Sequence, residues 1–339
     1  MSGLAAWLHH SGWPVEIVAG RRRPGRDVGE DVPVDLLESW EQRRWPQGLD
    51  EASSLVAGMA FRLRRLAPWL VHAFLYADAV AAHMADQPYV VSFGGMVAPE
   101  LFTGRPELWQ LFSLAAQGAR RIVVPSRAAA DHLKAMFGFD AVVVPDGVDM
   151  ARFADAHVRR QPGLILGPVF ADDARHRIEV LIDAFGMVAG QVPEAELVIT
   201  GPVDASRCET LVARVPADVR HRVRMVGAAD RQRMVTWYAR ATVTCAPAAA
   251  EASGTSLVES LAAGTPVVAA ASGVHREIVT GPEGILYATD DARACAEALI
   301  RMLRESADGE RQDVCRRRAR DFDWTVIGPQ LASVYREAR

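Results

Sequence analysis

Short runs of apolar residues rich in Val and Ile recur along the chain, with helix-like patterns between them. Within each run the hydrophobicity is continuous rather than alternating, which is typical of strands buried on both faces of a parallel sheet. The regular succession of strand and helix predicts an α/β protein with parallel sheets. The runs that predict strands cover residues 15–19, 69–73, 89–93, 121–125, 141–144, 163–167, 197–200, 223–226, 242–245 and 266–269.

Helical patterns fill the intervals between these runs. The first of them, residues 4–10, ends at Gly12 and precedes the first strand. A doubly wound domain normally opens with a strand and a glycine-rich turn, so either the true start lies upstream of Met1 or the first domain lacks both. The other predicted helices cover residues 126–137, 178–190, 231–241, 257–263 and 293–305.

A polar, arginine-containing stretch at residues 149–162 separates two halves of similar pattern. It leads through Pro162-Gly163, a turn signal, into a new strand. The length of 339 residues corresponds to about two domains. We therefore expect one domain over residues 1–155 and a second over residues 156–320.

The charges nearly balance, with 38 Lys and Arg against 42 Asp and Glu. This balance excludes a protein that binds nucleic acid through bulk basic charge. The basic residues are almost all arginines, because Lys134 is the sole lysine. An anion site that ordinarily uses a lysine must therefore use another cation, unless Lys134 lies there.

The four cysteines lie far apart in the sequence, so neither a zinc site nor a disulfide framework is indicated. We expect reduced thiols in the cytoplasm. We also expect no signal peptide and no transmembrane helix. The most lipid-like stretch, residues 66–82, is interrupted by Pro68, His72 and Asp78.

The candidate catalytic and binding residues concentrate at residues 247–268, a segment that follows one predicted strand and leads into the next. Glu251 and Glu259 have seven residues between them, and the turn Gly254-Thr255-Ser256 leads into an apolar helix. A strand, loop and helix in this order present backbone N–H groups at the amino end of the helix, where phosphate binds well. Gly254 lets the chain approach an anion closely.

A purely structural interpretation of the same residues is the alternative. Ser256-Leu-Val-Glu259 matches a capping box, in which the serine and glutamate side chains bond the first N–H groups of the helix. Glu251 would then be an ordinary loop carboxylate. Taken alone, the motif favours this structural interpretation, and only the rest of the sequence reverses that preference.

The wider sequence resembles the family 4 glycosyltransferases over nearly the whole second half. Pro145-Asp-Gly-Val-Asp149 is similar to the hinge motif of that family, with Asp146 where Asn is more usual. Phe322-Asp-Trp324 together with Tyr335 resembles its C-terminal helix. The other segments that carry the resemblance are LIDAF at 181–185, ELVITGP at 196–202, VRMVG at 223–227, MVTWYARA at 234–241, GTPVV at 264–268, GVHREIV at 273–279 and GIL at 284–286.

The resemblance implies the GT-B fold, in which two Rossmann-like domains with parallel sheets face a cleft. It assigns acceptor binding to residues 1–155 and nucleotide-sugar binding to residues 156–320, and it makes residues 321–339 a helix that packs back toward the N-terminal domain. The implied enzyme is a hexosyltransferase-like, retaining glycosyltransferase. It would need no metal and no cofactor beyond its donor substrate, a nucleotide-diphospho-sugar.

The same resemblance assigns roles within the two-glutamate motif. Glu259 would hold the ribose hydroxyls of the donor, and Glu251, taken as the catalytic residue, would contact hydroxyls of its sugar. The amides of Gly254, Thr255 and Ser256 would meet the diphosphate. Retention through a carboxylate nucleophile is known in glycosidases, but the resemblance favours attack on the front face without an enzyme nucleophile.

Two cation positions of the family are altered in this chain. The expected Arg after the first strand of the second domain falls on Pro168, and the expected Lys before its first helix falls on His176. Arg175 and Arg177 flank His176, and we expect one of them to reach the diphosphate with a planar fork in place of a point charge. We therefore include Arg175, His176 and Arg177 among the donor-binding candidates. The alternative is that both arginines lie on the surface of a loop.

The first domain also departs from the family pattern. Phe93 or Gly94 stands where a cleft histidine is common. His72, at the end of a predicted strand, is expected to be structural. The arginine-rich segment at residues 61–69 fits a surface that contacts anionic membranes, but an ordinary half-buried helix is the favoured interpretation because Pro68 truncates the segment.

The leading hypothesis is a bacterial, cytoplasmic glycosyltransferase with a nucleotide-sugar donor, a lipid, glycan or small-molecule acceptor, and no nucleic-acid partner. The arginine-rich segment would allow peripheral contact with the inner face of the membrane. The rival is a non-catalytic GT-B partner or regulatory subunit of an active glycosyltransferase, which the altered cation positions favour. A phosphorylase or epimerase of the same fold is a weaker alternative. The base, the sugar, the acceptor, the linkage and the oligomeric state are left open.

Overall fold

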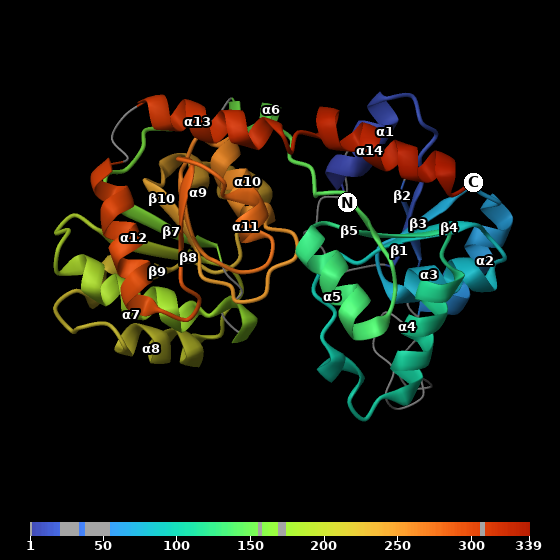
Figure 1. Ribbon diagram of the computed structural model, residues 1–339, viewed down its shortest axis with the longest axis horizontal. Helices are drawn as coiled ribbons and strands as arrows, with labels where there is room; N and C mark the ends of the chain where they lie inside the picture. Colours follow the sequence, from blue (N-terminus) through green and yellow to red (C-terminus); the bar gives the residue numbers. More distant parts are fainter. Residues whose placement is uncertain (1, 21–33, 38–54, 155–157, 169–173, 306–308) are drawn as a thin grey trace. The chain divides into compact units, whose positions relative to one another are not determined.

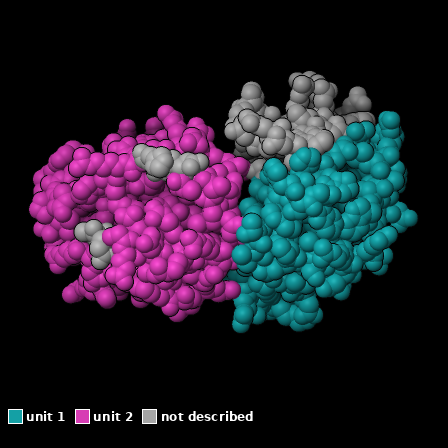
Figure 2. All heavy atoms as spheres, turned by 90° about the horizontal axis from the view of Figure 1, so that it is seen from above, with its two compact units in different colours: residues 1–147, 324–339 teal, residues 148–323 magenta. Residues whose placement is uncertain are grey.

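The computed structural model describes residues 2–339 apart from 21–33, 38–54, 155–157, 169–173 and 306–308. The chain forms two compact units, which Figure 2 shows in different colours. Unit 1 comprises residues 1–147 and 324–339, and unit 2 comprises residues 148–323. Each unit is built on parallel strands with helices between them (Figure 1), so the α/β architecture predicted from the sequence is confirmed.

Unit 2 contains a six-stranded parallel sheet with strand order β12-β11-β10-β7-β8-β9. The chain begins in the middle at β7, continues outward through β8 and β9, and then crosses back to form β10, β11 and β12 on the other side. The connections after β7 and β10 therefore leave in opposite directions, which creates the switch point where such sheets bind ligands. The strands are β7 (Leu164–Pro168), β8 (Glu196–Thr200), β9 (Val223–Met225), β10 (Val243–Ala246), β11 (Val267–Ala270) and β12 (Gly284–Tyr287).

Both faces of this sheet are buried, which explains the continuous hydrophobicity of its strands. In β7, Ile165 packs with α7 and α12 on one face, while Leu164 and Leu166 pack with α9, α10 and α13 on the other. The helices of unit 2 are α6 (Ala151–Ala154), α7 (Ile178–Ala189), α8 (Ala205–Ala213), α9 (Arg231–Arg240), α10 (Thr255–Ala262), α11 (His275–Ile278), α12 (Ala292–Glu305) and α13 (Gly309–Arg320), with 3-10 turns at Ala174–His176 and Arg220–Arg222.

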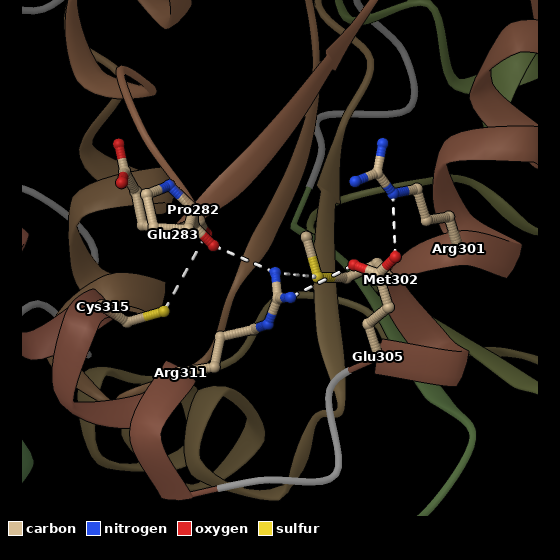
Figure 3. Close-up of polar contacts among 7 residues, drawn as sticks. All are labelled: Pro282, Glu283, Arg301, Met302, Glu305, Arg311 and Cys315. Carbon is tan, nitrogen blue, oxygen red and sulfur yellow. Dashed lines mark hydrogen bonds and ion pairs between the residues drawn. The ribbon is translucent and has the colours of Figure 1, made fainter.

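Arg311 on α13 joins three parts of unit 2 (Figure 3). Its Nη1 donates to the Pro282 carbonyl oxygen at 3.0 Å, in the segment before β12, and its Nη2 pairs with Glu305 of α12 at 3.2 Å. Nη1 also lies 3.6 Å from the Met302 sulfur. A guanidinium group carries five N–H donors in a planar fork, so this one side chain holds α13 against both neighbours.

Unit 1 contains a four-stranded parallel sheet in chain order, β3-β4-β5-β6, and a separate parallel pair, β1-β2. The strands predicted for this half are confirmed to within two residues at each end, but β2 is not predicted by the sequence pattern. The elements are α1 (Ser2–His10), β1 (Ile17–Gly20), β2 (Val34–Leu37), α2 (Val56–Leu66), β3 (Val71–Ala73), α3 (Tyr76–Met84), β4 (Tyr89–Ser92), a 3-10 turn (Pro99–Phe102), α4 (Pro106–Gly118), β5 (Arg121–Val124), α5 (Arg127–Phe137), β6 (Val142–Val143) and α14 (Trp324–Glu337).

The C-terminal helix α14 packs on α1 within unit 1. Leu4 and Leu8 of α1 form an apolar cluster with Ile327 and Leu331 of α14, and Val90 of β4 belongs to the same cluster. The two ends of the chain therefore share one hydrophobic core.

The limits of the two units differ from the domain limits expected at residues 155 and 320. Unit 2 begins at Val148 and ends at Asp323. The cause is packing: Val148, Phe153 and Phe322 all lie in the apolar core of unit 2. The Val148 N–H also donates to the Phe322 carbonyl oxygen at 2.8 Å.

His72 on β3 has a structural role in unit 1, as the sequence suggests. Its Nδ1 lies 2.6 Å from the Tyr335 hydroxyl of α14, and its Nε2 lies 2.7 Å from the Ser92 hydroxyl at the end of β4. The ring stacks on Phe74 with centroids 4.1 Å apart. Burial lowers the pKa of His72 to about 3, so the imidazole is neutral at neutral pH.

The low pKa of His72 makes the stability of unit 1 depend on pH. Between the ordinary histidine pKa of 6.5 and the lowered pKa of about 3, the unfolded chain binds a proton that the folded chain does not. The free energy of unfolding therefore falls as the pH falls through this window, by about 2–3 kcal/mol at a pH near 4.5. His72→Gln should remove this contribution, which urea unfolding followed by tryptophan fluorescence at neutral and acidic pH measures.

The matched control is His9→Gln, because His9 is an exposed histidine on α1 of the same unit. Its pH dependence should equal that of the parent protein. Trp237 is the single tryptophan of unit 2, so the fluorescence reports mainly on unit 1. A pH dependence that His72→Gln leaves intact would contradict a buried, neutral imidazole.

Candidate functional site

Three loops of unit 2 are hydrogen-bonded to one another at the carboxyl ends of β7, β10 and β11. The Ala249 N–H, after β10, donates to the Arg175 carbonyl oxygen, after β7, at 2.9 Å. The Val274 N–H, after β11, donates to the Glu251 carbonyl oxygen at 3.1 Å. These bonds bring the connections around the switch point together, where an open α/β sheet binds its ligand.

The Glu251 side chain turns back onto its own loop. Its Oε1 accepts hydrogen bonds from the N–H groups of Ala252 at 3.0 Å, Ser253 at 3.1 Å and Gly254 at 3.4 Å. The Ser253 hydroxyl donates to the same oxygen at 3.3 Å. The loop before α10 therefore has the geometry to bind an oxyanion, and it fixes the orientation of this carboxylate.

Gly254 immediately precedes α10 and has a left-handed backbone with φ of 62°. An added Cβ would overlap the Ile278 side chain and lie 3.0 Å from Cγ1 of Val274. Backbone conformation and close packing therefore both require glycine. The helix then begins at Thr255, which is exposed, followed by the half-buried Ser256, so its first turn is accessible.

The capping-box interpretation of Ser256 and Glu259 is wrong. Gly254 is the residue at the amino end of α10, and Ser256 already lies within the first helical turn. The helix begins two residues earlier than the capping pattern requires. Among the described residues, no side-chain hydrogen bond caps the amino end of α10.

Glu259 is half-buried beside α9. Burial raises the pKa of its carboxyl group, whereas the Tyr238 hydroxyl, Arg231 and Arg152 lower it. Tyr238 is 1% exposed, and its own pKa is raised, first by burial and then by Glu259. A carboxylate offers about four lone-pair sites, so that of Glu259 can accept hydrogen bonds from hydroxyl groups of a ligand.

The candidate cations differ in their surroundings. Arg177 precedes α7, and its Nε pairs with Asp290, on the connection after β12, at 2.9 Å. Arg175 is exposed, and its backbone bonds the loop that carries Glu251. His176 is half-buried between them. The structure thus places the backbone of Arg175 next to the motif and pairs the Arg177 side chain with Asp290.

His275 on α11 is a further neighbour of the motif. It is 1% exposed, and its Nδ1 donates to the Ala270 carbonyl oxygen at 2.9 Å. Burial lowers the pKa of His275, and the nearby Glu251 carboxylate raises it. Four residues that influence the motif are not among the candidates chosen from the sequence: Tyr238, Arg231, Arg152 and His275. The sequence alone does not indicate that they lie near the motif, although Tyr238 belongs to the MVTWYARA segment.

In unit 1 the loop after β4 carries Phe93 and Gly94. Phe93 is buried and its ring centroid lies 5.0 Å from that of Phe112. Gly94 is exposed, and an added Cβ would meet nothing within 4 Å. Position 94 therefore has room for a ligand beside the backbone, whereas Phe93 belongs to the core.

The arginine-rich segment forms α2, a half-buried helix. Phe61 is 64% exposed, and Arg64 and Arg65 are exposed as well. Arg62 pairs with Glu16 at 3.5 Å. The exposed face of α2 combines an aromatic ring with basic charge.

The four cysteines are free thiols. The sulfurs of Cys245 and Cys295 lie 3.8 Å apart in the core of unit 2. Across the described part of the chain, no group of three or more His, Cys, Asp and Glu side chains is placed to hold a metal ion. None of the described helices has both the length and the apolar character needed to cross a bilayer.

Two family models match the chain. One described as "Glycosyltransferase Family 4" matches residues 2–152, and one described as "Glycosyl transferases group 1" matches residues 164–305. The two matches together cover most of both units.

Curated relatives include the phosphatidyl-myo-inositol mannosyltransferase of Mycolicibacterium smegmatis. It is 33% identical over 224 residues, which are 63% of this chain and 56% of that protein. The protein of the same name from Propionibacterium freudenreichii is 29% identical over 265 residues, which are 76% of this chain and 66% of that protein. The chain thus spans little more than half the length of the first of these relatives.

Solved structures resemble the chain over nearly its full length. Sucrose-phosphate synthase from Thermosynechococcus elongatus gives a TM-score of 0.81 at 22% identity, covering 98% of this chain and 91% of that one. HepE of Anabaena, in complex with UDP and glucose, gives 0.74 at 17% identity, covering 94% and 98%. At these identities the likeness shows the fold.

Gly254→Ala should destabilise unit 2 through two separate effects. The left-handed backbone costs a side chain about 1 kcal/mol, and the overlap with Ile278 adds about 1–3 kcal/mol. Gly227→Ala is the matched control, because Gly227 has a φ of 69° and open space around the added Cβ. It should show the backbone cost alone. Equal losses of the free energy of unfolding for the two variants, measured in urea by circular dichroism, would contradict the crowding at Gly254.

Proposed function

Because this chain belongs to the family 4 glycosyltransferases and has the GT-B fold, we propose that it transfers a sugar from a nucleotide-diphospho-sugar to an acceptor with retention of configuration. The observation that carries the proposal is the two-glutamate motif at the switch point of unit 2, with Glu251 on the loop after β10 and Glu259 on α10. Because its relatives are named mannosyltransferases, we expect the donor to carry a hexose, and mannose is the first candidate.

The donor diphosphate would bind at the first turn of α10. Backbone N–H groups and the helix dipole favour negative charge there. The N–H groups of residues 252–254, including that of Gly254 expected at the diphosphate, donate to the Glu251 carboxylate instead, so the diphosphate would lie at the first turn of the helix itself. Arg175 adds positive charge beside this loop. These groups would stabilise the diphosphate as it leaves and its charge increases.

Glu251 would orient the donor sugar. Its Oε1 is held by the loop, so Oε2 can accept a hydrogen bond from a sugar hydroxyl. We assign it no covalent role. In the proposed step the acceptor oxygen attacks the anomeric carbon from the face that the diphosphate leaves, the bond to the diphosphate breaks, and the acceptor proton passes to a diphosphate oxygen. Attack from the same face retains the configuration.

The acceptor would be a lipid, a glycan or a small molecule. The names of the relatives favour a lipid among these. The exposed face of α2, with Phe61, Arg64 and Arg65, suits the surface of an anionic membrane because basic groups and an aromatic ring favour the interface. We propose that the protein works in the cytoplasm, in peripheral contact with the inner face of the membrane.

The alternative function is that of a non-catalytic GT-B partner of an active glycosyltransferase. The observation that favours it is Pro168 at the carboxyl end of β7, in register with Thr200 of β8. A proline supplies neither charge nor an N–H group to a phosphate. A partner protein of this kind would not bind nucleotide through Glu259.

Nucleotide binding separates the two functions. We expect one of the diphosphates UDP, GDP and ADP to raise the melting temperature, since a ligand at 100 times its Kd adds about 2.7 kcal/mol of stability. Glu259→Ala should weaken the binding of that diphosphate by at least about 10-fold, because hydrogen bonds to a charged group are lost. Calorimetry measures the affinity, and proton NMR of the product made with the matching hexose donor gives the anomeric configuration.

The control for this experiment is Glu209→Ala, which removes an exposed carboxylate of α8 in the same unit. It should leave the affinity unchanged. Absence of any thermal shift with all three diphosphates would favour the partner function. An inverted product would contradict the front-face step and leave the transferase proposal in place.

The two arginines beside the motif should differ in effect. Arg175→Ala should weaken binding of the diphosphate by about 5- to 50-fold, because a charge-assisted contact with phosphate is lost. Arg177→Ala should change the affinity for the diphosphate by less than about 2-fold, because the Arg177 side chain pairs with Asp290. Loss of this exposed ion pair should also change the free energy of unfolding little. Calorimetry at low and high salt checks both. The opposite ranking would assign the phosphate contact to Arg177.

A further inference from the structure

Four donors converge on one oxygen of the Glu251 carboxylate, and one of them is the Ser253 hydroxyl. Glu251 Oε1 accepts hydrogen bonds from the N–H groups of residues 252–254 at 3.0, 3.1 and 3.4 Å. Ser253 Oγ donates to the same oxygen at 3.3 Å. Ser253 therefore holds this oxygen through its side chain as well as through its backbone.

The Ser253 hydroxyl is itself oriented by its neighbour. Thr255, the first residue of α10, donates from Oγ1 to Ser253 Oγ at 3.3 Å. A hydroxyl has one proton to donate, so a serine oxygen that accepts from Thr255 directs its own proton to Glu251. Hydrogen bonds in such a chain polarise and strengthen one another. The chain links the start of the helix to the carboxylate.

A second carboxylate of unit 2 is held in a similar way, and the comparison shows what is different about Glu251. Glu283 Oε1 accepts from the N–H groups of Thr280 and Gly281 at 2.6 and 2.8 Å, and from Thr280 Oγ1 at 3.4 Å. Glu283 is 3% exposed and precedes β12, at the amino ends of the strands. Glu251 is half-buried and follows β10, at the carboxyl ends, so its second oxygen can meet a ligand.

We propose that Ser253 is a positioning residue of the donor site, whose hydroxyl fixes Oε1 of Glu251 so that Oε2 meets a hydroxyl of the donor sugar. This inference rests on the proposed function. Every hydrogen bond that the described residues donate to the Glu251 carboxylate goes to Oε1, which leaves the lone pairs of Oε2 for a ligand. A carboxylate fixed at one oxygen loses less freedom when the other oxygen binds. Ser253 would not touch the sugar itself, because its effect passes through Glu251.

The test compares two ligands that differ by the sugar. The probes are UDP, GDP and ADP with UDP-glucose, GDP-mannose and ADP-glucose, and the pair used is the one whose diphosphate binds the parent most tightly. Calorimetry gives the ratio of the affinity for the nucleotide-sugar to the affinity for the diphosphate. Ser253→Ala should lower this ratio by about 2- to 5-fold, less than for a full charge-assisted hydrogen bond because four donors share the oxygen.

A double-mutant cycle separates a role through Glu251 from a role in the fold. Glu251→Ala should lower the ratio by about 10-fold, because the acceptor for the sugar is lost. Ser253→Ala added to Glu251→Ala should lower it by less than about 1.5-fold more, since a residue that acts through the carboxylate has no effect once the carboxylate is gone. The matched control is Thr280→Ala, which removes the hydroxyl that donates to Glu283 and should leave both affinities unchanged.

Equal losses of the two affinities in Ser253→Ala would mean that Ser253 only supports the loop, and would overturn the proposal. An unchanged ratio in Ser253→Ala, with the ratio lowered in Glu251→Ala, would also overturn it while the proposed function stands. A further fall of the ratio in the double variant would show that Ser253 acts without Glu251, with the same consequence. An unchanged ratio in Glu251→Ala would remove the sugar-binding role of that carboxylate and this inference with it. A parent protein that binds none of the three diphosphates would overturn the proposed function as well.

Discussion

The left-handed backbone of Gly254 is the constraint on which the candidate site depends. Because a side chain there would overlap Ile278, only glycine allows the loop to lie against α11 while α10 begins at the next residue. With α10 so placed, the N–H groups of residues 252–254 converge on the Glu251 carboxylate, and Glu259 comes to face α9. One backbone conformation therefore orients both glutamates of the motif.

The same region balances burial against charge. Burial disfavours the ionised form of Glu259, and an isolated carboxylate in an apolar setting would take up a proton rather than stay charged. Tyr238, Arg231 and Arg152 offset this cost. Each of these contacts is stronger than it would be in water, because the local dielectric is low. A carboxylate in such surroundings is a strong acceptor for a ligand hydroxyl, provided that its neighbours stay in place.

The elements that the sequence predicts best are those whose pattern is local. Leu164 and Ile165 pack on opposite faces of the sheet, so β7 is a continuous apolar run. Strand β12 lies at the edge of the sheet, where Ile285 and Leu286 are only half-buried, and its pattern is correspondingly weak. The two-glutamate motif is also local, so its place on a loop and a helix follows from the sequence.

What the sequence does not predict are the partners of these side chains. Tyr238, on the preceding helix, influences the pKa of Glu259, and Arg177 pairs with Asp290 on a connection far along the chain. These pairs depend on how helices pack on the sheet, which no spacing rule encodes. The capping box fails for the same reason: packing of Gly254 against α11 starts the helix earlier than the local pattern suggests. The assignment of Glu259 to its role therefore needs tertiary structure.

The near absence of lysine determines how the site can obtain positive charge. Lys134 lies on α5 in unit 1, where it pairs with Asp140, so every fixed side-chain cation of unit 2 is an arginine. Guanidinium groups there also serve as clamps, as Arg160 does with the Ala241 and Gly264 carbonyl oxygens. Arg175 differs, because its backbone belongs to the loops that meet at the switch point.

The guanidinium of Arg175 is a planar fork, whereas the lysine expected at position 176 would present a point charge. The replacement of the usual cations by Pro168 and His176 therefore does not by itself remove phosphate binding from this fold. In the proposed donor site the charge would come from the neighbouring Arg175, whose carbonyl oxygen, on the loop after β7, accepts a hydrogen bond from the Ala249 N–H at 2.9 Å.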